Sequence, residues 1–284
     1  MAGERIQHAT IIGVGLLGGS IGLALREQFP DIEVAGIGRR ASSLRAARRV
    51  GAINTAHLDN YDVAARSDLV IIATPVGAYE NILRAIKPHL KTGSLVTDAG
   101  STKSQVVRVA SRVLGKGGQF VGSHPMAGGE QKGPAYARAN LLSGATCVVT
   151  PTAKTPKNLL LRTEKLWRKL GMKIVTMSPA SHDQAVARVS HLPHILACAL
   201  MEVPRADDFA VSATGLRDMT RLAGGDAEMW RDIVATNRKP IIAAMRTMRK
   251  KLDRIEQLVE QDDSQAIYRA LIQAKTRHDK QLKR

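Results

Sequence analysis

Hydrophobic and polar positions alternate in two different rhythms along the chain. Up to about residue 177, short apolar runs alternate with segments of helical spacing. The runs predict strands, and the spaced segments predict helices. The predicted strands are 8–15, 34–37, 68–74, 94–98, 120–123, 145–149 and 173–177, and the helices are 18–28, 41–50, 78–87 and one starting near 102. Such alternation is typical of an α/β domain on a parallel sheet with right-handed crossovers.

After residue 178 the spacing is helical throughout. We expect helices at 181–203, 226–237, 238–260 and 264–282, with a kink at Pro193 in the first. Two capping-box patterns, Thr102–Gln105 and Ser181–Gln184, are expected to start helices. An apolar stripe follows helix 238–260: Ile241, Met245, Met248, Leu252, Ile255 and Val259. We therefore predict an α/β domain at 1–178 and an all-helical domain at 179–284, and the stripe favours a homodimer.

Composition narrows the class of protein. The 284 residues carry a net charge of +17, but only 3% are aromatic, and these are not interleaved with the basic residues. Stacking platforms for bases are therefore missing, and we expect no nucleic-acid partner; a basic surface also suits anionic small molecules. No apolar run approaches the length of a membrane span, and residues 1–10 do not resemble a signal peptide. Two distant cysteines, Cys147 and Cys198, fit the reducing cytoplasm better than a disulfide framework.

A glycine-rich turn follows the first predicted strand. Gly13, Gly15 and Gly18 form a G-x-G-x-x-G that opens a helix, the context in which the pattern indicates a dinucleotide site. A pyrophosphate would lie at the helix N-terminus, where free N–H groups favour anions. This pattern identifies the α/β domain as a Rossmann domain. The expected cofactor-binding residues are completed by the rest of the turn and the end of strand 68–74: Leu16, Leu17, Thr74 and Pro75.

The end of the second predicted strand bears on the cofactor. An NAD enzyme normally has a carboxylate there, on the ribose hydroxyls. Gly38 is followed instead by Arg39 and Arg40, which suit a 2′-phosphate. We expect NADP to be preferred and NAD to be possible, unless both arginines simply face solvent.

Three histidines and one arginine are candidates for chemistry. His124 lies at a strand end, where parallel sheets bind ligands. His191 and His194 are three residues apart and share a helix face. No carboxylate or cysteine accompanies them in a ligand pattern, so we expect no metal. Arg221 lies in an irregular stretch where a surface role is equally open from spacing alone.

Several separate motifs, in order, resemble the prephenate and arogenate dehydrogenases of tyrosine biosynthesis. The resemblance runs from about residue 9 to about 240. The motifs are Gly13–Ser20, Ala73–Val76, Asp98–Lys103, Ser123–Glu130, Ser190–His194 and Gly215–Arg221.

The resemblance implies a Rossmann domain, a helical dimerisation domain and oxidative decarboxylation of a cyclohexadienol. It further implies that His124 is the catalytic histidine at the ring alcohol, that Ser101 supports it, and that Arg221 holds the ring carboxylate. His194 joins the catalytic group. The remaining substrate-pocket positions are His191, Ser190, Glu130, Asp218 and Trp230.

Other interpretations are open at this point. The substrate is prephenate or arogenate, since the motifs do not reach its side-chain end. Another Rossmann enzyme, such as a hydroxyacid dehydrogenase, is an alternative, but those enzymes carry a catalytic lysine and 188–198 offers none. A non-enzymatic nucleic-acid-binding protein is suggested by charge alone.

Overall fold

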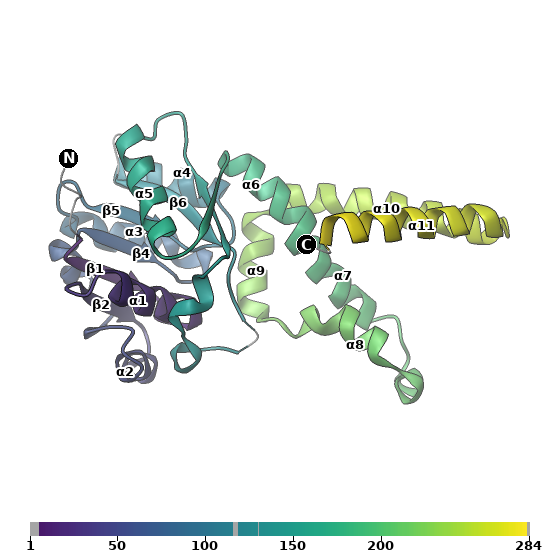
Figure 1. Ribbon diagram of the computed structural model, residues 1–284, viewed down its shortest axis with the longest axis horizontal. Coiled ribbons are helices and arrows are strands. Elements are labelled where there is room, and N and C mark those ends of the chain that lie inside the picture. The colour runs from purple at the N-terminus through teal and green to yellow at the C-terminus, as the bar shows by residue number, and fades with distance from the viewer. Residues whose placement is uncertain (1–5, 116–118, 130, 283–284) are drawn as a thin grey trace. The chain divides into compact units, whose positions relative to one another are not determined.

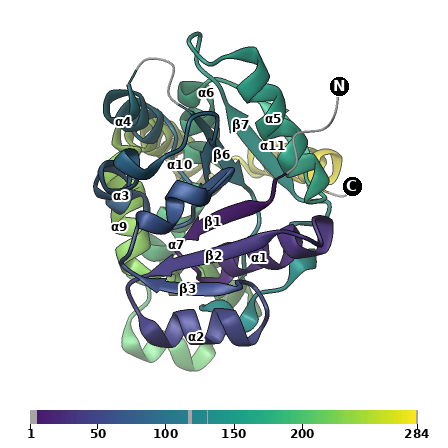
Figure 2. The same cartoon turned by 90° about the vertical axis from the view of Figure 1, so that its left-hand side faces the viewer.

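The computed structural model describes residues 6–115, 119–129 and 131–282. Its centre is an eight-stranded sheet in the order β3-β2-β1-β4-β5-β6-β7-β8 (Figures 1 and 2). The strands are β1 (His8–Ile12), β2 (Glu33–Gly38), β3 (Thr55–Leu58), β4 (Leu69–Ile72), β5 (Leu95–Asp98), β6 (Phe120–Pro125), β7 (Thr146–Thr150) and β8 (Lys173–Thr176). Every predicted strand is present.

The sheet differs from the expectation in two places. Strand β3 was not predicted, because its four residues Thr-Ala-His-Leu are mostly exposed at the sheet edge and show no apolar run. Strand β7 runs antiparallel to β6, so the expectation of an all-parallel sheet is wrong at this pair. The described residues between these two strands form 3₁₀ turns instead of the α-helix that a parallel crossover needs. The sheet is therefore mostly parallel.

Helices cover both faces of the sheet (Figure 2). On one face lie α1 (Leu16–Gln28), α2 (Ala41–Arg49) and α5 (Lys157–Lys169), whose side chains Leu25, Leu44 and Trp167 are buried against the strands. On the other face lie α3 (Tyr79–Ile86) and α4 (Ser104–Leu114). All four residues of β4 are completely buried, as expected for a strand covered on both sides.

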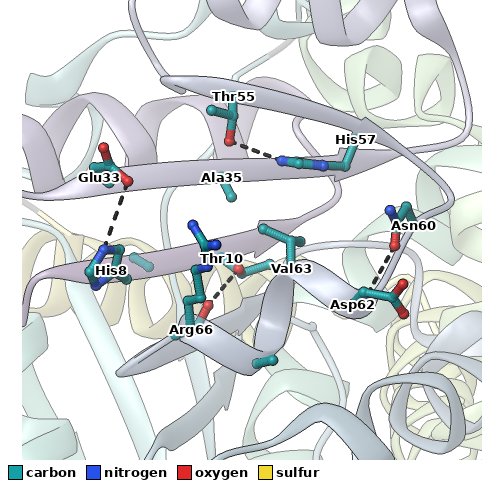
Figure 3. Close-up of a pocket in the computed structure, with 13 residues that line it drawn as sticks. His8, Thr10, Glu33, Ala35, Thr55, His57, Asn60, Asp62, Val63 and Arg66 are labelled. Carbon is teal, nitrogen blue, oxygen red and sulfur yellow. Dashed lines mark hydrogen bonds and ion pairs between the residues drawn. The ribbon is translucent and has the colours of Figure 1, made fainter.

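One part of the sheet has little cover. Strand β3 continues directly into a 3₁₀ turn, Asp62–Arg66, with no helix before β4. A hollow of about 360 Å³ remains on the sheet there, lined by His8, Glu33 and His57 from three strands (Figure 3). None of the predicted site residues lines it.

Three of the helices that follow the sheet are close to their predicted positions: α6 (Pro179–Val186), α7 (Leu192–Met201) and α9 (Ala227–Thr236). Helix α8 (Thr214–Thr220) was not predicted, and the expectation of an irregular stretch before Arg221 is wrong there. Its seven residues are too few to show a helical period in the sequence. Helix α6 is capped by Ser178, whose hydroxyl accepts from the Ser181 N–H at 3.1 Å, so the predicted cap at Ser181 is wrong. A π-helical turn, Ala187–His191, precedes Pro193 and interrupts the α-helical pattern where the kink was expected.

By residue contacts the chain forms two compact units, residues 1–238 and 239–284. The second contains most of α10 (Arg238–Glu260) and all of α11 (Ser264–Leu282), both of which match the prediction. The predicted apolar stripe on α10 is largely exposed in the single chain, with Leu252, Ile255 and Val259 each about half exposed or more. The domain boundary at 178 stays a prediction. No described helix is both long and apolar enough to cross a membrane.

Candidate active site

The glycine turn between β1 and α1 has the shape that its sequence predicts. Gly13 has a φ of +96°, and a Cβ there would lie 2.6 Å from the Ala73 carbonyl oxygen. A Cβ on Gly18 would collide with the Gly13 carbonyl oxygen. Gly15 caps α1, and nothing lies within 4 Å of where its Cβ would be. The open space over this helix N-terminus fits a pyrophosphate, with Leu16 and Leu17 in the first helical turn.

The turn lies at the point where the strand order reverses. From β1 the chain moves outward through β2 and β3, then returns to the other side of β1 as β4. Ile12 and Ile72 are aligned in register, so Gly13 and Ala73 leave the sheet side by side. Thr74 and Pro75 follow, and the Thr74 hydroxyl donates to the Pro75 carbonyl oxygen at 3.3 Å. Open α/β sheets bind their ligands in the crevice at such a reversal.

The end of β2 carries the two arginines in exposed positions. Arg40 is the cap residue of α2, and Arg39 precedes it. The missed strand β3 brings an acidic residue alongside, since the Asp59 N–H donates to the Gly38 carbonyl oxygen at 3.2 Å. Burial and the Asp59 carboxylate raise the pKa of Tyr61, whereas Arg39 lowers it, so both charged groups lie near that hydroxyl. The arginines therefore have a carboxylate in their neighbourhood.

A chain of hydrogen bonds runs back from His124 at the end of β6. His124 Nδ1 lies 2.8 Å from His182 Nε2, and His182 Nδ1 lies 2.9 Å from the Asp183 carboxylate. That carboxylate also accepts from the backbone N–H groups of Lys103 and Ser104, each at 2.8 Å. Asp183 thus satisfies the N-terminus of α4, so the predicted capping box at Thr102 is wrong.

An ion pair with no solvent exposure lies next to this series of hydrogen bonds. The Lys103 ammonium contacts the Asp98 carboxylate, and both side chains are completely buried. Asp98 also accepts from the N–H groups of Gly100 and Ser123, each at 2.9 Å. The pair joins the end of β5 to the strand that carries His124.

His124 is neutral in this environment. Burial lowers its pKa well below the usual value, and the neighbouring His182 and Lys103 lower it further. A neutral imidazole has one nitrogen with a free lone pair, which can accept a proton from an alcohol. The side chain is half-buried, so it is not sealed from ligand.

His191, His194 and Trp230 form an aromatic cluster between α9 and the helical segment before and within α7. The His194 ring stacks on Trp230 at 3.5 Å between centroids, and His191 meets Trp230 edge-on at 5.9 Å. Burial lowers the pKa of His191 to about 4. The Asn237 amide nitrogen donates to the Asp183 carbonyl oxygen at 2.8 Å and lies 3.0 Å from His191 Nδ1. His191 Nδ1 therefore accepts, and its ring proton is on Nε2.

The other predicted site residues are exposed or half-buried around the site, or lie outside the residues that the structure describes. Arg221 and Asp218 are exposed, at and near the end of α8, and Ser190 is half-buried in the π turn. Among the described residues, the Ser101 hydroxyl makes no hydrogen bond to His124. Glu130 lies outside the described residues.

Sequence reasoning missed His182, Asp183 and Asn237. The first two lie inside the Ser181–Gln184 pattern, which was interpreted as a helix cap. Their signal was a histidine beside an aspartate at the start of a helix, but only the fold reveals the partner 58 residues away.

Comparison with protein families identifies two domains. The sequence profile of the prephenate dehydrogenase nucleotide-binding domain matches residues 21–176. The profile of the prephenate dehydrogenase dimerization domain matches residues 178–273. Together they cover strands β2 to β8 and most of the helices, whereas β1 and the glycine turn precede the first match.

Individual relatives agree with these matches. The chain is 35% identical to a prephenate dehydrogenase of Bacillus subtilis over 281 residues, covering 95% of this chain and 74% of the relative. The crystal structure of A. aeolicus prephenate dehydrogenase with hydroxyphenyl propionate and NAD⁺ is similar over 98% of this chain and 99% of that one, with a TM-score of 0.92 and 30% identity. Synechocystis arogenate dehydrogenase is similar over 96% and 99%, with a TM-score of 0.83 and 28% identity.

Proposed function

Because the chain belongs to the prephenate dehydrogenase family, we propose that it converts prephenate to 4-hydroxyphenylpyruvate and CO₂ in tyrosine biosynthesis. It is a dehydrogenase that uses a nicotinamide cofactor. The observation that carries this proposal is a neutral histidine, His124, at the strand ends of a sheet whose glycine turn fits a dinucleotide. A hydroxyacid dehydrogenase would instead need a lysine in the helical segment 188–198.

The reaction has simple requirements. Prephenate carries an alcohol at ring C4 and a carboxylate at C1. The bound nicotinamide would accept the hydride from C4. His124 accepts the hydroxyl proton as the C4 carbonyl forms. The C1 carboxylate then leaves as CO₂, its bonding electrons complete the aromatic ring and pass to the C4 oxygen as a phenolate, and His124 returns the proton to that oxygen.

Several side chains would bind and orient the substrate. Arg221 would hold the ring carboxylate as a planar double donor, and Ser101 would support His124. The His194–Trp230 stack and His191 would form an aromatic wall, and Ser190, Asp218 and Glu130 would complete the pocket. A glycine turn with Leu16, Leu17, Thr74 and Pro75 would hold the cofactor.

The active form is a homodimer, with the helices after the sheet as the dimerization domain. The exposed apolar side chains on α10 are suited to a second copy of the chain. We place the enzyme in the cytoplasm, on the support of two cysteines, Cys147 and Cys198, that are both free thiols.

We propose that NADP is preferred over NAD. Arg39 and Arg40 are exposed at the end of β2, beside the N-terminus of α2, where a 2′-phosphate would gain charge-assisted hydrogen bonds. Gly38 carries no carboxylate to repel it. Asp59, directly after the neighbouring strand β3, is the reason to expect that NAD is tolerated.

Replacing Arg39 and Arg40 together by alanine is expected to bring kcat/KM for NADP and NAD close to parity. Two guanidinium donors to the 2′-phosphate would be lost, while contacts to the rest of the cofactor remain. The matched control is Arg48→Ala with Arg49→Ala, which removes two charges from the last turn of the same helix. Wild-type enzyme that clearly favours NAD would show that Arg39 and Arg40 face solvent.

Arg221→Ala is expected to raise the KM for prephenate about 10–150-fold, because a charge-assisted hydrogen bond to a carboxylate contributes roughly 1.5–3 kcal/mol. The control is Arg217→Ala, one turn earlier in α8 and also exposed. Initial rates at saturating cofactor measure both variants. An unchanged KM in folded protein would assign the ring carboxylate to another cation.

The substrate is tested by following reduced cofactor at 340 nm with prephenate and with arogenate. We expect a higher kcat/KM for prephenate. A higher value for arogenate would assign the chain to the arogenate branch of the family, and no rate with either would overturn the proposed function.

A further inference from the structure

We propose that His182 and Asp183 hold His124 in the one tautomer that leaves Nε2 free to accept the substrate proton. They are positioning residues, because the hydrogen bonds that define their role reach His124 and α4. The inference rests on the proposed function for its role in catalysis, but not for the tautomer itself.

Asp183 lies at the far end of this series of hydrogen bonds, and its partners fix its protonation state. An ionised carboxylate only accepts hydrogen bonds. Two backbone N–H groups at the start of α4 donate to it, and it lies 2.9 Å from His182 Nδ1. Burial raises the pKa of Asp183, but the hydrogen bonds from His182, Ser104 and Lys103 outweigh it and lower that pKa, so the carboxylate is ionised at neutral pH. His182 must therefore carry a proton on Nδ1.

The other nitrogen of His182 faces His124. Its side chain is completely buried, and burial lowers its pKa, so the ring is neutral. A neutral imidazole with its proton on Nδ1 has a lone pair on Nε2. That nitrogen lies 2.8 Å from His124 Nδ1, which must then be the donor.

His124 is the last residue in this series of hydrogen bonds. It is neutral as well, so a proton on Nδ1 leaves Nε2 unprotonated. When Nε2 takes the proton of the substrate hydroxyl, Nδ1 keeps its own proton and its bond to His182. The ring gains one positive charge, and the Asp183 carboxylate at the end of the chain compensates it electrostatically.

The geometry keeps this chain in place. Asp183 is attached to α4 through its carboxylate and to Asn237 through its carbonyl oxygen. The His124 and His182 rings meet at 68° with centroids 5.1 Å apart, an arrangement in which one ring edge faces the other. A slipped or flipped His124 ring would lose its only described hydrogen-bond partner on Nδ1 among residues 6–115, 119–129 and 131–282.

The tautomer is measured directly by ¹⁵N NMR of histidine-labelled protein, with the His124 signals identified by their loss in His124→Asn. In wild type we expect Nε2 of His124 to show the shift of an unprotonated nitrogen and Nδ1 that of a protonated one. A wild-type spectrum with the proton on Nε2 would overturn the proposal, whether or not any variant folds.

Two substitutions separate positioning from packing. His182→Phe keeps a buried ring but no acceptor, and we expect mixed tautomers. We expect it to lower kcat about 10–100-fold, a part of the 10²–10⁴-fold that a positioned base supplies. His182→Gln offers a carbonyl oxygen close to the position of Nε2, so it should restore the wild-type tautomer and most of kcat. KM for the cofactor should change little in both.

The outcomes distinguish this inference from the proposed function. Wild-type protein with the expected tautomer but no rate on prephenate or arogenate would reject the function and keep the chain of hydrogen bonds. Active protein in which His182→Phe leaves the tautomer and kcat unchanged would reject the positioning role.

Discussion

His124→Asn is expected to lower kcat by about 10²–10⁴-fold, the range that a positioned general base contributes, and to leave cofactor binding unchanged. The side chain lies at the end of β6, and its neutral ring is prepared to accept a proton. Asparagine is of similar polarity but has no basic nitrogen. Steady-state rates measure kcat, and fluorescence titration measures cofactor affinity.

The control for this substitution is His89→Asn. His89 lies in a 3₁₀ turn after α3, where it pairs with Asp62 at 3.2 Å, and takes no part in the site. It should keep wild-type kcat. Near-normal kcat in folded His124→Asn would mean that His124 is structural and that another group takes the proton.

Lys103→Met is expected to destabilise the folded protein by about 3–5 kcal/mol, because it leaves the buried Asp98 carboxylate without its cation. Both side chains have no solvent exposure, and methionine keeps a similar length without the charge. Urea unfolding at one fixed protein concentration measures the change, since the stability of a dimer depends on concentration.

The matched control is Lys275→Met on α11, whose ion pair with Asp279 is 2.9 Å long and well exposed. An exposed pair contributes only about 0.2–1 kcal/mol, so this variant should be close to wild type. Adding Asp98→Asn to Lys103→Met should recover part of the stability, because no unpaired charge then stays buried. Equal losses for the two lysine variants would contradict a buried pair.

Much of the fold could be predicted because its signals are local. The run Leu69–Ile72 is apolar at every position, and all four side chains are buried. The stripe on α10 defined that helix to its last residue. Strand β3 could not be predicted, since its pairing to β2 stabilises a segment with no hydrophobic pattern of its own. The direction of β7 depends on the connection before it, which gives no periodic signal.

The sequence predicted those parts of the site in which the local backbone conformation requires one residue type. Gly13 requires a positive φ, and Gly18 a close approach of helix to turn. His182 and Asp183 were misinterpreted because Ser-His-Asp-Gln also satisfies the pattern of a helix cap. Their carboxylate does cap a helix, but it is α4, 79 residues earlier at Ser104. Such a long-range contact has no counterpart in local spacing.

In the proposed reaction, oxidation of the ring alcohol is coupled to loss of the ring carboxylate. The most direct measurement is the stoichiometry of reduced cofactor, CO₂ and 4-hydroxyphenylpyruvate formed from prephenate. We expect one of each per turnover, with His124→Asn lowering all three rates together. Reduced cofactor without CO₂, as a simple hydroxyacid dehydrogenase would give, would show that the chain does not carry out oxidative decarboxylation.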